Sequence, residues 1–363
     1  MLVVVLVAGL GVGRAQAQAS LEPNVVTAST MGPDQRRAID QFAGYYVDDL
    51  ISADPNKRSP ARTALLEPLD NRNVSVDFRM HYSDRLMDEL RRVAGHEDTR
   101  IAINGLRIAG ALATEDSTEL LIEASDDDRD DVRYVSAWGI RQTFEEVGRS
   151  APAIDQIRIQ ELVELLELRL GIENEPHVFD VVGRALTAAG RLDHQRWRAI
   201  RDYAQHVQAR VTAVRVKTLN PGPNDTKMLI AVARTLDAQV WFIKDNIASD
   251  EVMRGAAGLA GQVVSYAGSR AKAGDLDDKE RLELQDLVKR AEALIFFAHN
   301  ALDPAGRHAS TDLADLLAQD GDPQMFDDQM FADEAVKQVI GHGGVLCQPP
   351  FRFPATEFAR GDP

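Results

Sequence analysis

Apolar positions recur every three or four residues along most of this chain, which is the period of an amphipathic helix. The pattern predicts helices over residues 33–51 and 77–94, and three longer ones beyond residue 224. One face of the first of those three collects Met228, Val232, Leu236, Val240, Ile243 and Ile247. The composition, rich in Ala, Leu and charged residues and poor in β-branched ones, also favours helices. The sequence therefore predicts an all-α protein.

Residues 98–148 contain an internal repeat. The segment 101–107 (IAINGLR) returns 34 positions later as 135–141 (VSAWGIR). Between the copies lie another helical stretch, 117–125, and the acidic connector 126–131. A helix, a polar turn, a second helix and a restart are typical of an α-solenoid, in which helical hairpins stack in a row.

The second copy carries a family resemblance. It opens with Asp131-Val132-Arg133 and continues with small and aliphatic residues, namely Ala137, Gly139 and Ile140. This resembles HEAT-type repeats, whose second helix typically opens with Asp, Val and Arg. The first copy opens with Asp98-Thr99-Arg100, which lacks the Val. The resemblance covers about residues 98–190, with a third unit over 154–190, and implies a stack of HEAT-like helical hairpins.

Glycine recurs inside the expected helices, at Gly105, Gly139, Gly183 and Gly258. A glycine inside a helix costs about 1 kcal/mol relative to alanine. We therefore expect these positions to mark close approaches between neighbouring helices. The alternative is chance recurrence in a chain rich in Ala and Gly.

The strongest helix breaker is the segment 220–224 (NPGPN). It predicts a boundary between a HEAT-like repeat domain, residues 33–219, and an antiparallel bundle of long helices, residues 224–319. Residues 320–363 are acidic and then rich in Pro and Gly, which predicts a flexible tail.

Residues 1–19 have the pattern of a secretory signal. An apolar run of 13 residues is followed by RAQAQA, in which small residues alternate with larger ones. The run is too short to span a bilayer permanently. We expect cleavage and export to the periplasm or outside the cell, with no membrane span in the processed protein. The alternatives are a dinucleotide-binding loop, whose last glycine would fall on Arg14 or Gln16, or a buried apolar terminus.

The charge balance narrows the class of partner. The chain has 41 Lys plus Arg and 57 Asp plus Glu, a net charge of −16. Such a surface repels phosphate backbones and anionic lipid, which argues against nucleic acid, although it leaves room for a local basic groove. The single cysteine, Cys347, excludes a disulfide within the chain and is expected to be incidental in the tail.

Signatures of chemistry are sparse. The sequence has no H-E-x-x-H, G-x-S-x-G or phosphate-loop motif, and no two histidines stand three or four residues apart. The connector 126–131 (DDDRDD) has enough carboxylates for calcium but lacks the spacing of an EF-hand loop, and helix capping explains it more simply. We predict no catalytic, cofactor or metal site, and a protein that is not an enzyme.

One set of residues could contact a partner. Tyr134, Trp138, Arg141 and Glu145 fall on one helix stripe, and Tyr, Trp and Arg are enriched at the centres of protein interfaces. We predict that Tyr134, Trp138 and Arg141 bind a partner. The alternative is that Tyr134 and Trp138 pack against the adjacent repeat.

Three functional hypotheses remain. The leading one is an exported, non-enzymatic helical-repeat scaffold whose concave surface binds a protein or peptide. The second is an envelope-associated structural protein that self-associates through the apolar stripes of its C-terminal bundle. The third is an enzyme with an unrecognised site between the solenoid and the bundle.

Overall fold

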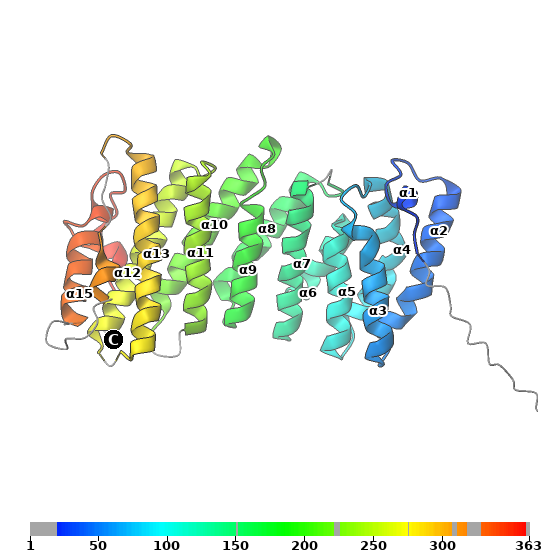
Figure 1. The fold of residues 1–363 in the computed structure, drawn as a ribbon, viewed down its shortest axis with the longest axis horizontal. Coiled ribbons are helices and arrows are strands. Elements are labelled where there is room, and N and C mark those ends of the chain that lie inside the picture. The colour runs from blue at the N-terminus through cyan, green and yellow to red at the C-terminus, as the bar shows by residue number, and fades with distance from the viewer. Residues whose placement is uncertain are drawn as a thin grey trace, which may run out of the picture.

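The computed structural model describes residues 20–149, 152–220, 226–274, 276–306, 311–317 and 328–360. Its helices stand side by side in one long row that runs from α2 (Pro33–Tyr46), in blue, to α15 (Asp328–Ala335), in red (Figure 1). The predicted signal segment, residues 1–19, lies outside the described residues. Within the described residues, no helix combines the length and apolar character that a membrane crossing requires.

The helices form two layers, and each hairpin contributes one helix to each. The even layer consists of α2, α4 (Val76–Ala94), α6 (Glu115–Ala124), α8 (Gln156–Ile172), α10 (Arg198–Thr218) and α12 (Asp250–Lys272). The odd layer consists of α3 (Pro55–Leu66), α5 (Thr99–Leu112), α7 (Asp130–Arg149), α9 (Pro176–Ala189), α11 (Thr226–Lys244) and α13 (Asp278–Leu302). Each helix packs on its hairpin partner and on the next helix of its own layer. The predicted all-α, HEAT-like solenoid is confirmed.

Shorter elements fill the ends and connections of the row. They are α1 (Pro23–Val26), the 3₁₀ turns η1 (Val47–Ile51), η2 (Glu67–Asp70) and η3 (Gln195–Trp197), and α14 (Leu313–Leu317).

Arginines tie successive hairpin turns together. Arg129, in the connector before α7, donates to the carbonyl of His96 in the preceding turn at 2.8 Å. Arg133 donates to the Glu173 carboxylate in the following turn at 2.9 Å, and Arg169 pairs with Asp126 at 2.8 Å. Hydrogen bonds from Arg129 also hold the pKa of Asp127 below its usual value. The acidic connector therefore joins three turns through its arginine partners.

Two glycines bring α5 and α7 into backbone contact. A Cβ added at Gly110 would lie 2.5 Å from the Cα of Gly139, and one at Gly139 would lie 2.7 Å from Cδ2 of Leu121. Gly105 is similarly close to α4, with 3.0 Å from its added Cβ to the carbonyl oxygen of Leu90. The expected close approach is confirmed at Gly105 and Gly139. It is wrong at Gly183, where the nearest atom is 3.8 Å away.

A layer of buried amides separates two apolar clusters of the core. The first cluster runs from Val25 to Ala231 and the second from Val216 to Phe358. Between them, Gln208 donates to the carbonyl of Gly183 at 2.8 Å, and Gln239 donates to the Gln208 amide oxygen at 3.2 Å. The row of hairpins nevertheless continues, because α11 packs on α9 and α12 on α10. A domain boundary at residues 220–224 stays a prediction.

The prediction of a flexible tail is wrong for residues 328–360. There α15 packs on α12 and continues into a π-helical turn, η4 (Val336–Ile340), and the 3₁₀ turns η5 (Val345–Cys347) and η6 (Ala355–Phe358). Ser265 of α12 donates to the carbonyl of Phe358 at 2.7 Å. The tail folds back because α12 is apolar on several sides, and its apolar surface is removed from water when the tail packs on it. The buried residues of the tail include Phe331, Val339, Leu346, Phe351 and Phe358.

Cys347 accordingly lies in folded structure rather than in a loose tail. Its thiol is half-buried and donates to the carbonyl of Ile340 at 3.4 Å. Burial raises the pKa of this thiol, so it stays protonated at neutral pH and has little thiolate reactivity.

Gly110→Ala should destabilise the protein by about 1–3 kcal/mol, because the new Cβ meets the α7 backbone, which has no side chain that can rotate away. Gly183→Ala is the matched control. It adds the same methyl group inside a neighbouring helix with room to spare, and should be neutral or stabilise by up to about 1 kcal/mol. Urea midpoints followed by circular dichroism at 222 nm compare the two. Equal midpoints would contradict the close-packing assignment.

The Arg133–Glu173 pair predicts a pH dependence of stability. Burial tends to raise the pKa of Glu173, but hydrogen bonds from Arg133 and from backbone N–H groups outweigh it and hold that pKa below 4.5. The pair therefore stabilises the fold above about pH 4.5, and this contribution is lost as the pH falls through the lowered value. Glu173→Gln should lower the unfolding midpoint at pH 7 and converge with wild type once the pH is below the lowered pKa of Glu173. Glu164→Gln, on an exposed face of α8, should match wild type at both pH values.

Candidate functional site: an arginine groove on the odd layer

The residues predicted to bind a partner lie on the free side of α7. Tyr134, Trp138 and Arg141 are all half-buried, and the two aromatic rings rest partly on the core. The Tyr134 hydroxyl accepts a hydrogen bond from Arg184 of α9 at 3.4 Å. Arg141 donates to Glu145 at 2.8 Å. These side chains therefore pack partly on the core and are still partly exposed to a partner. Their role as partner contacts stays a prediction.

Arginine recurs on the free stripe of successive odd helices. Each odd helix from α5 to α11 is covered by its hairpin partner and by both neighbours in its layer, and α13 is covered by α11, α12 and α14, so only positions three or four apart reach solvent. Those positions include Arg107 on α5, Arg141 on α7, Arg184 on α9, Arg234 on α11 and Arg290 on α13. The same kind of residue therefore marks one surface along most of the row.

The row extends to the N-terminal end of the layer. Arg62 of α3 donates to the side-chain oxygen of Asn104 at 2.9 Å. Burial and then the positive charges of Arg107 and Arg58 lower the pKa of Arg62. The guanidinium groups on α3 and α5 are thus close enough for their positive charges to repel each other.

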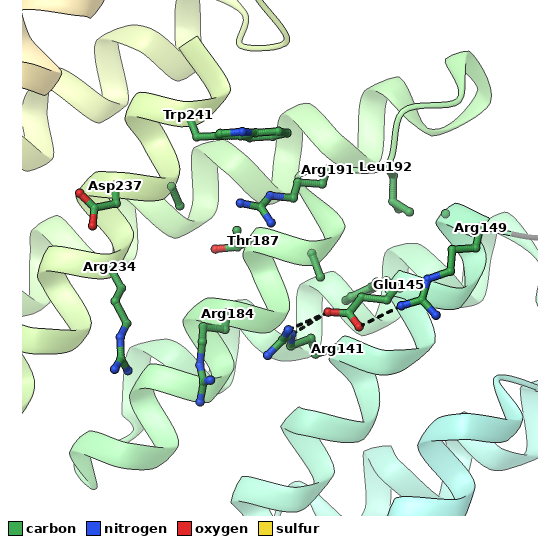
Figure 2. A pocket seen from close by; sticks show the side chains of 14 residues that line it. Arg141, Glu145, Arg149, Arg184, Thr187, Arg191, Leu192, Arg234, Asp237 and Trp241 are labelled. Carbon is green, nitrogen blue, oxygen red and sulfur yellow. Dashed lines mark hydrogen bonds and ion pairs between the residues drawn. The ribbon is translucent and has the colours of Figure 1, made fainter. Parts of the chain in front are cut away.

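A groove of about 610 Å³ crosses α7, α9 and α11 and gathers five arginines. Arg141, Arg184 and Arg234 lie along one side of it, one from each helix (Figure 2). The opposite side carries Arg149, Arg191, which follows α9, and Trp241 of α11 (Figure 2). The short side chain of Thr187 lies between the two rows.

Carboxylates neutralise only part of this positive charge. Glu145 bridges Arg141 at 2.8 Å and Arg149 at 3.7 Å. Beside the groove, Asp180 bridges Arg184 at 3.1 Å and Arg234 at 2.6 Å. The other acidic residue of the lining, Asp237, pairs with Arg290 of α13. Arg149 also approaches Glu146 at 3.9 Å. The five arginines of the lining therefore outnumber the carboxylates that pair with them, which are Glu145, Glu146 and Asp180.

Arg191 is the arginine with the least compensation. Its guanidinium carbon lies 4.4 Å from the centre of the Trp241 ring, in the geometry of a cation–π contact. Within the described part of the chain, no carboxylate oxygen lies within 4.0 Å of its nitrogens. The side chain is exposed, and the indole fixes its orientation without neutralising it. This is a positioned cation that faces solvent.

A separate group of ligand-type side chains lies at the start of α7 and α9. The ligand atoms of Asp130, Glu175 and His177 are within 4.8 Å of one another, and His177 approaches Asp130 at 3.4 Å. All three residues are exposed. Exposed acidic groups at helix N-termini are explained by the helix dipole, so we assign no metal to them.

Sequence reasoning found Arg141 but missed the rest of the groove. Arg107 and Arg141 follow their repeat glycines by two positions, whereas Arg184 directly follows Gly183, so the repeat register did not align Arg184 with the other two. No pattern in the sequence around Arg191 or Trp241 indicated a binding site. The two residues are 50 positions apart and meet only because α9 and α11 are neighbours.

No family model and no curated protein matches this sequence. Among solved structures the chain is similar to a crystallised engineered protein, with 13% identity, a TM-score of 0.34, and coverage of 70% of this chain and 97% of that one. It is also similar to a designed armadillo repeat protein, with 14% identity, a TM-score of 0.30, and coverage of 81% and 98%. Importin-beta from yeast gives 12% identity and a TM-score of 0.41 over 86% of this chain and 49% of that one.

The helix order and the two layers define the class of protein. Hairpins that stack in register, with one helix of each in each layer, make this a HEAT-like helical-repeat protein.

Proposed function

We propose that this protein is a non-enzymatic helical-repeat scaffold that binds a protein or peptide partner on its odd layer. The observation that carries the proposal is the groove over α7, α9 and α11, where five arginines and Trp241 face one space. Arg and Trp are the side chains that contribute most to binding energy at protein interfaces. A groove that spans three repeats suits an extended partner better than a compact small molecule.

The free stripes of the odd helices support the same proposal. On α7 the covered sides carry small or aliphatic residues such as Ala137 and Ile140, whereas the free stripe carries Tyr134, Trp138 and Arg141. If the free stripe of α7 only had to face water, small polar or charged side chains would be sufficient. Half-buried aromatic rings beside arginines offer a partner both apolar area and hydrogen-bond donors.

Self-association through the C-terminal bundle has less support. The apolar stripe of α13 was expected to be free for a second copy, but it packs against α12 and α11 within the chain. Its members are buried, namely Leu284, Leu287, Val288, Ala291, Leu294, Ile295 and Ala298. A partner of different chemistry on the odd layer therefore accounts better for the exposed surface.

We further propose that the protein is exported. The support is the apolar run in residues 1–19 and the small residues that follow it. A partner would then be met in the periplasm or outside the cell.

Partner capture tests the binding surface. Trp138→Ala and Arg141→Gln, each made in the full chain, should reduce recovery of specific partners from an extract of the source cells, because both remove side chains from the odd layer. Arg198→Gln is the matched control, since Arg198 is exposed on α10 in the even layer. Quantitative mass spectrometry of the captured proteins gives the comparison. Partner sets that are identical for wild type and all three variants would sink the proposed surface.

Export has its own test. Expression in the source cell followed by N-terminal sequencing of the purified protein should show a new terminus after Ala17 or Ala19. A retained Met1 would contradict export through this segment and leave the binding proposal intact.

A further inference from the structure

We infer that the groove takes an acidic segment of the partner, bound in the extended polyproline II conformation, with carboxylates spaced at about every third residue. The inference rests on the proposed function and adds the chemistry of the ligand. It starts from a local inversion of charge. The whole chain carries −16, yet the groove lining holds five arginines against Glu145 and Asp237. A protein that is acidic overall therefore concentrates arginines in this groove.

The positions of the arginines suggest a repeat in the ligand. Arg141, Arg184 and Arg234 come from three successive helices of one layer and lie in a row (Figure 2). Packed helices are about 8–10 Å apart, so the backbone carries one of these arginines at roughly that interval, although the side chains of Arg184 and Arg234 meet at Oδ2 of Asp180. A peptide in the polyproline II conformation has three residues per turn and rises about 3.1 Å per residue, so every third side chain lies on the same face at intervals of about 9 Å. Carboxylates at every third position would therefore face the row of arginines together.

The opposite side of the groove supplies an anchor. Arg191 is held over Trp241 at 4.4 Å and lacks a carboxylate partner among the residues that the structure describes. A guanidinium fixed in this way can donate two parallel hydrogen bonds to one carboxylate, and the stacking reduces the entropy lost when it does so. The exposed edge of the indole can then contact an apolar side chain next to that acid in the ligand.

The carboxylates in and beside the groove favour a peptide over other anions. Glu145, Asp180 and Asp237 alternate with the arginines, so positive and negative positions are interleaved. Duplex DNA presents one charge per roughly 1.7 Å, and its phosphates would face these carboxylates as well as the arginines. A peptide avoids that repulsion by placing neutral residues between its acids. The overall charge of −16 repels nucleic acid and anionic membranes further.

Defined peptides test the inference on the full-length protein. The probe is a fluorescein-labelled peptide of about twelve residues with Glu at every third position, one Leu, and Ser elsewhere, measured by fluorescence anisotropy. Three further probes are a peptide of the same composition with its glutamates in one block, a Gln-for-Glu peptide, and oligothymidylate. We expect the spaced peptide to bind at least tenfold more tightly than the other three. We also expect binding to weaken severalfold as salt rises from 50 to 500 mM, because part of it is Coulombic.

Three variants locate the peptide in the groove. Arg191→Gln should weaken the spaced peptide about tenfold, as expected for the loss of a charged, paired hydrogen bond. The even-layer control Arg198→Gln should leave its affinity unchanged, and both residues are exposed, so neither change threatens the fold. Asp180→Asn should tighten binding severalfold, because it releases Arg184 and Arg234 from their shared partner. A loss of folding cannot produce such a gain.

The outcomes separate this inference from the proposed function. Equal affinity for the spaced and blocked peptides, or tighter binding of oligothymidylate, would overturn the assignment of a spaced acidic segment. The same holds if Arg191→Gln and Arg198→Gln behave alike. If no peptide binds while Trp138→Ala still loses its captured partner, the scaffold function stands and only the acidic chemistry is wrong. Tight binding of the spaced peptide by wild type, together with weaker binding by Arg191→Gln, supports both the acidic-segment inference and the proposed scaffold function.

Discussion

The close approach of α5 and α7 at Gly110 and Gly139 is the constraint on which the odd layer depends. With no side chain between the two backbones, the helices pack at a short distance that leaves only one narrow stripe of each in solvent. A bulkier pair would separate the hairpins and change the interval at which successive stripes present their side chains. These two positions therefore set the interval between the free stripes of α5 and α7, which carry Arg107 and Arg141.

Arginines serve two different purposes in this fold. Arg79 is buried and Arg133 is half-buried, and each pairs with a glutamate. Arg79 also donates to the carbonyls of Ala111 and Leu112, and Arg133 to those of Asp127 and Asp128. A buried ion pair is retained without penalty only when such extra hydrogen bonds offset the loss of water. The arginines of the groove instead stay half in solvent and share their few carboxylates. The first set fixes the hairpins, and the second remains able to change partners.

The C-terminal end of the stack is covered by residues 328–360. A solenoid exposes an apolar face wherever the row stops, and a terminal segment must cover it. Here α15 and the turns after it place Phe331, Phe351 and Phe358 on or beside the last hairpin. Between this end and the rest of the core, the buried amides of Gln208 and Gln239 introduce a polar layer whose hydrogen bonds require the two parts to stay in register.

The sequence by itself determined the helices, their pairing into hairpins and one member of the groove, because each depends on residues close together in the chain. Apolar spacing defines a helix face locally, and the echo at Gly105 and Gly139 repeats the unit that builds the stack. Only the tertiary structure decided which arginines face a common space, since Arg141, Arg191 and Arg234 come from three repeats. It also decided the state of residues 328–360, whose Pro and Gly content predicted flexibility. Their aromatic side chains are buried only because α12 presents an uncovered apolar surface, and no local pattern shows that surface.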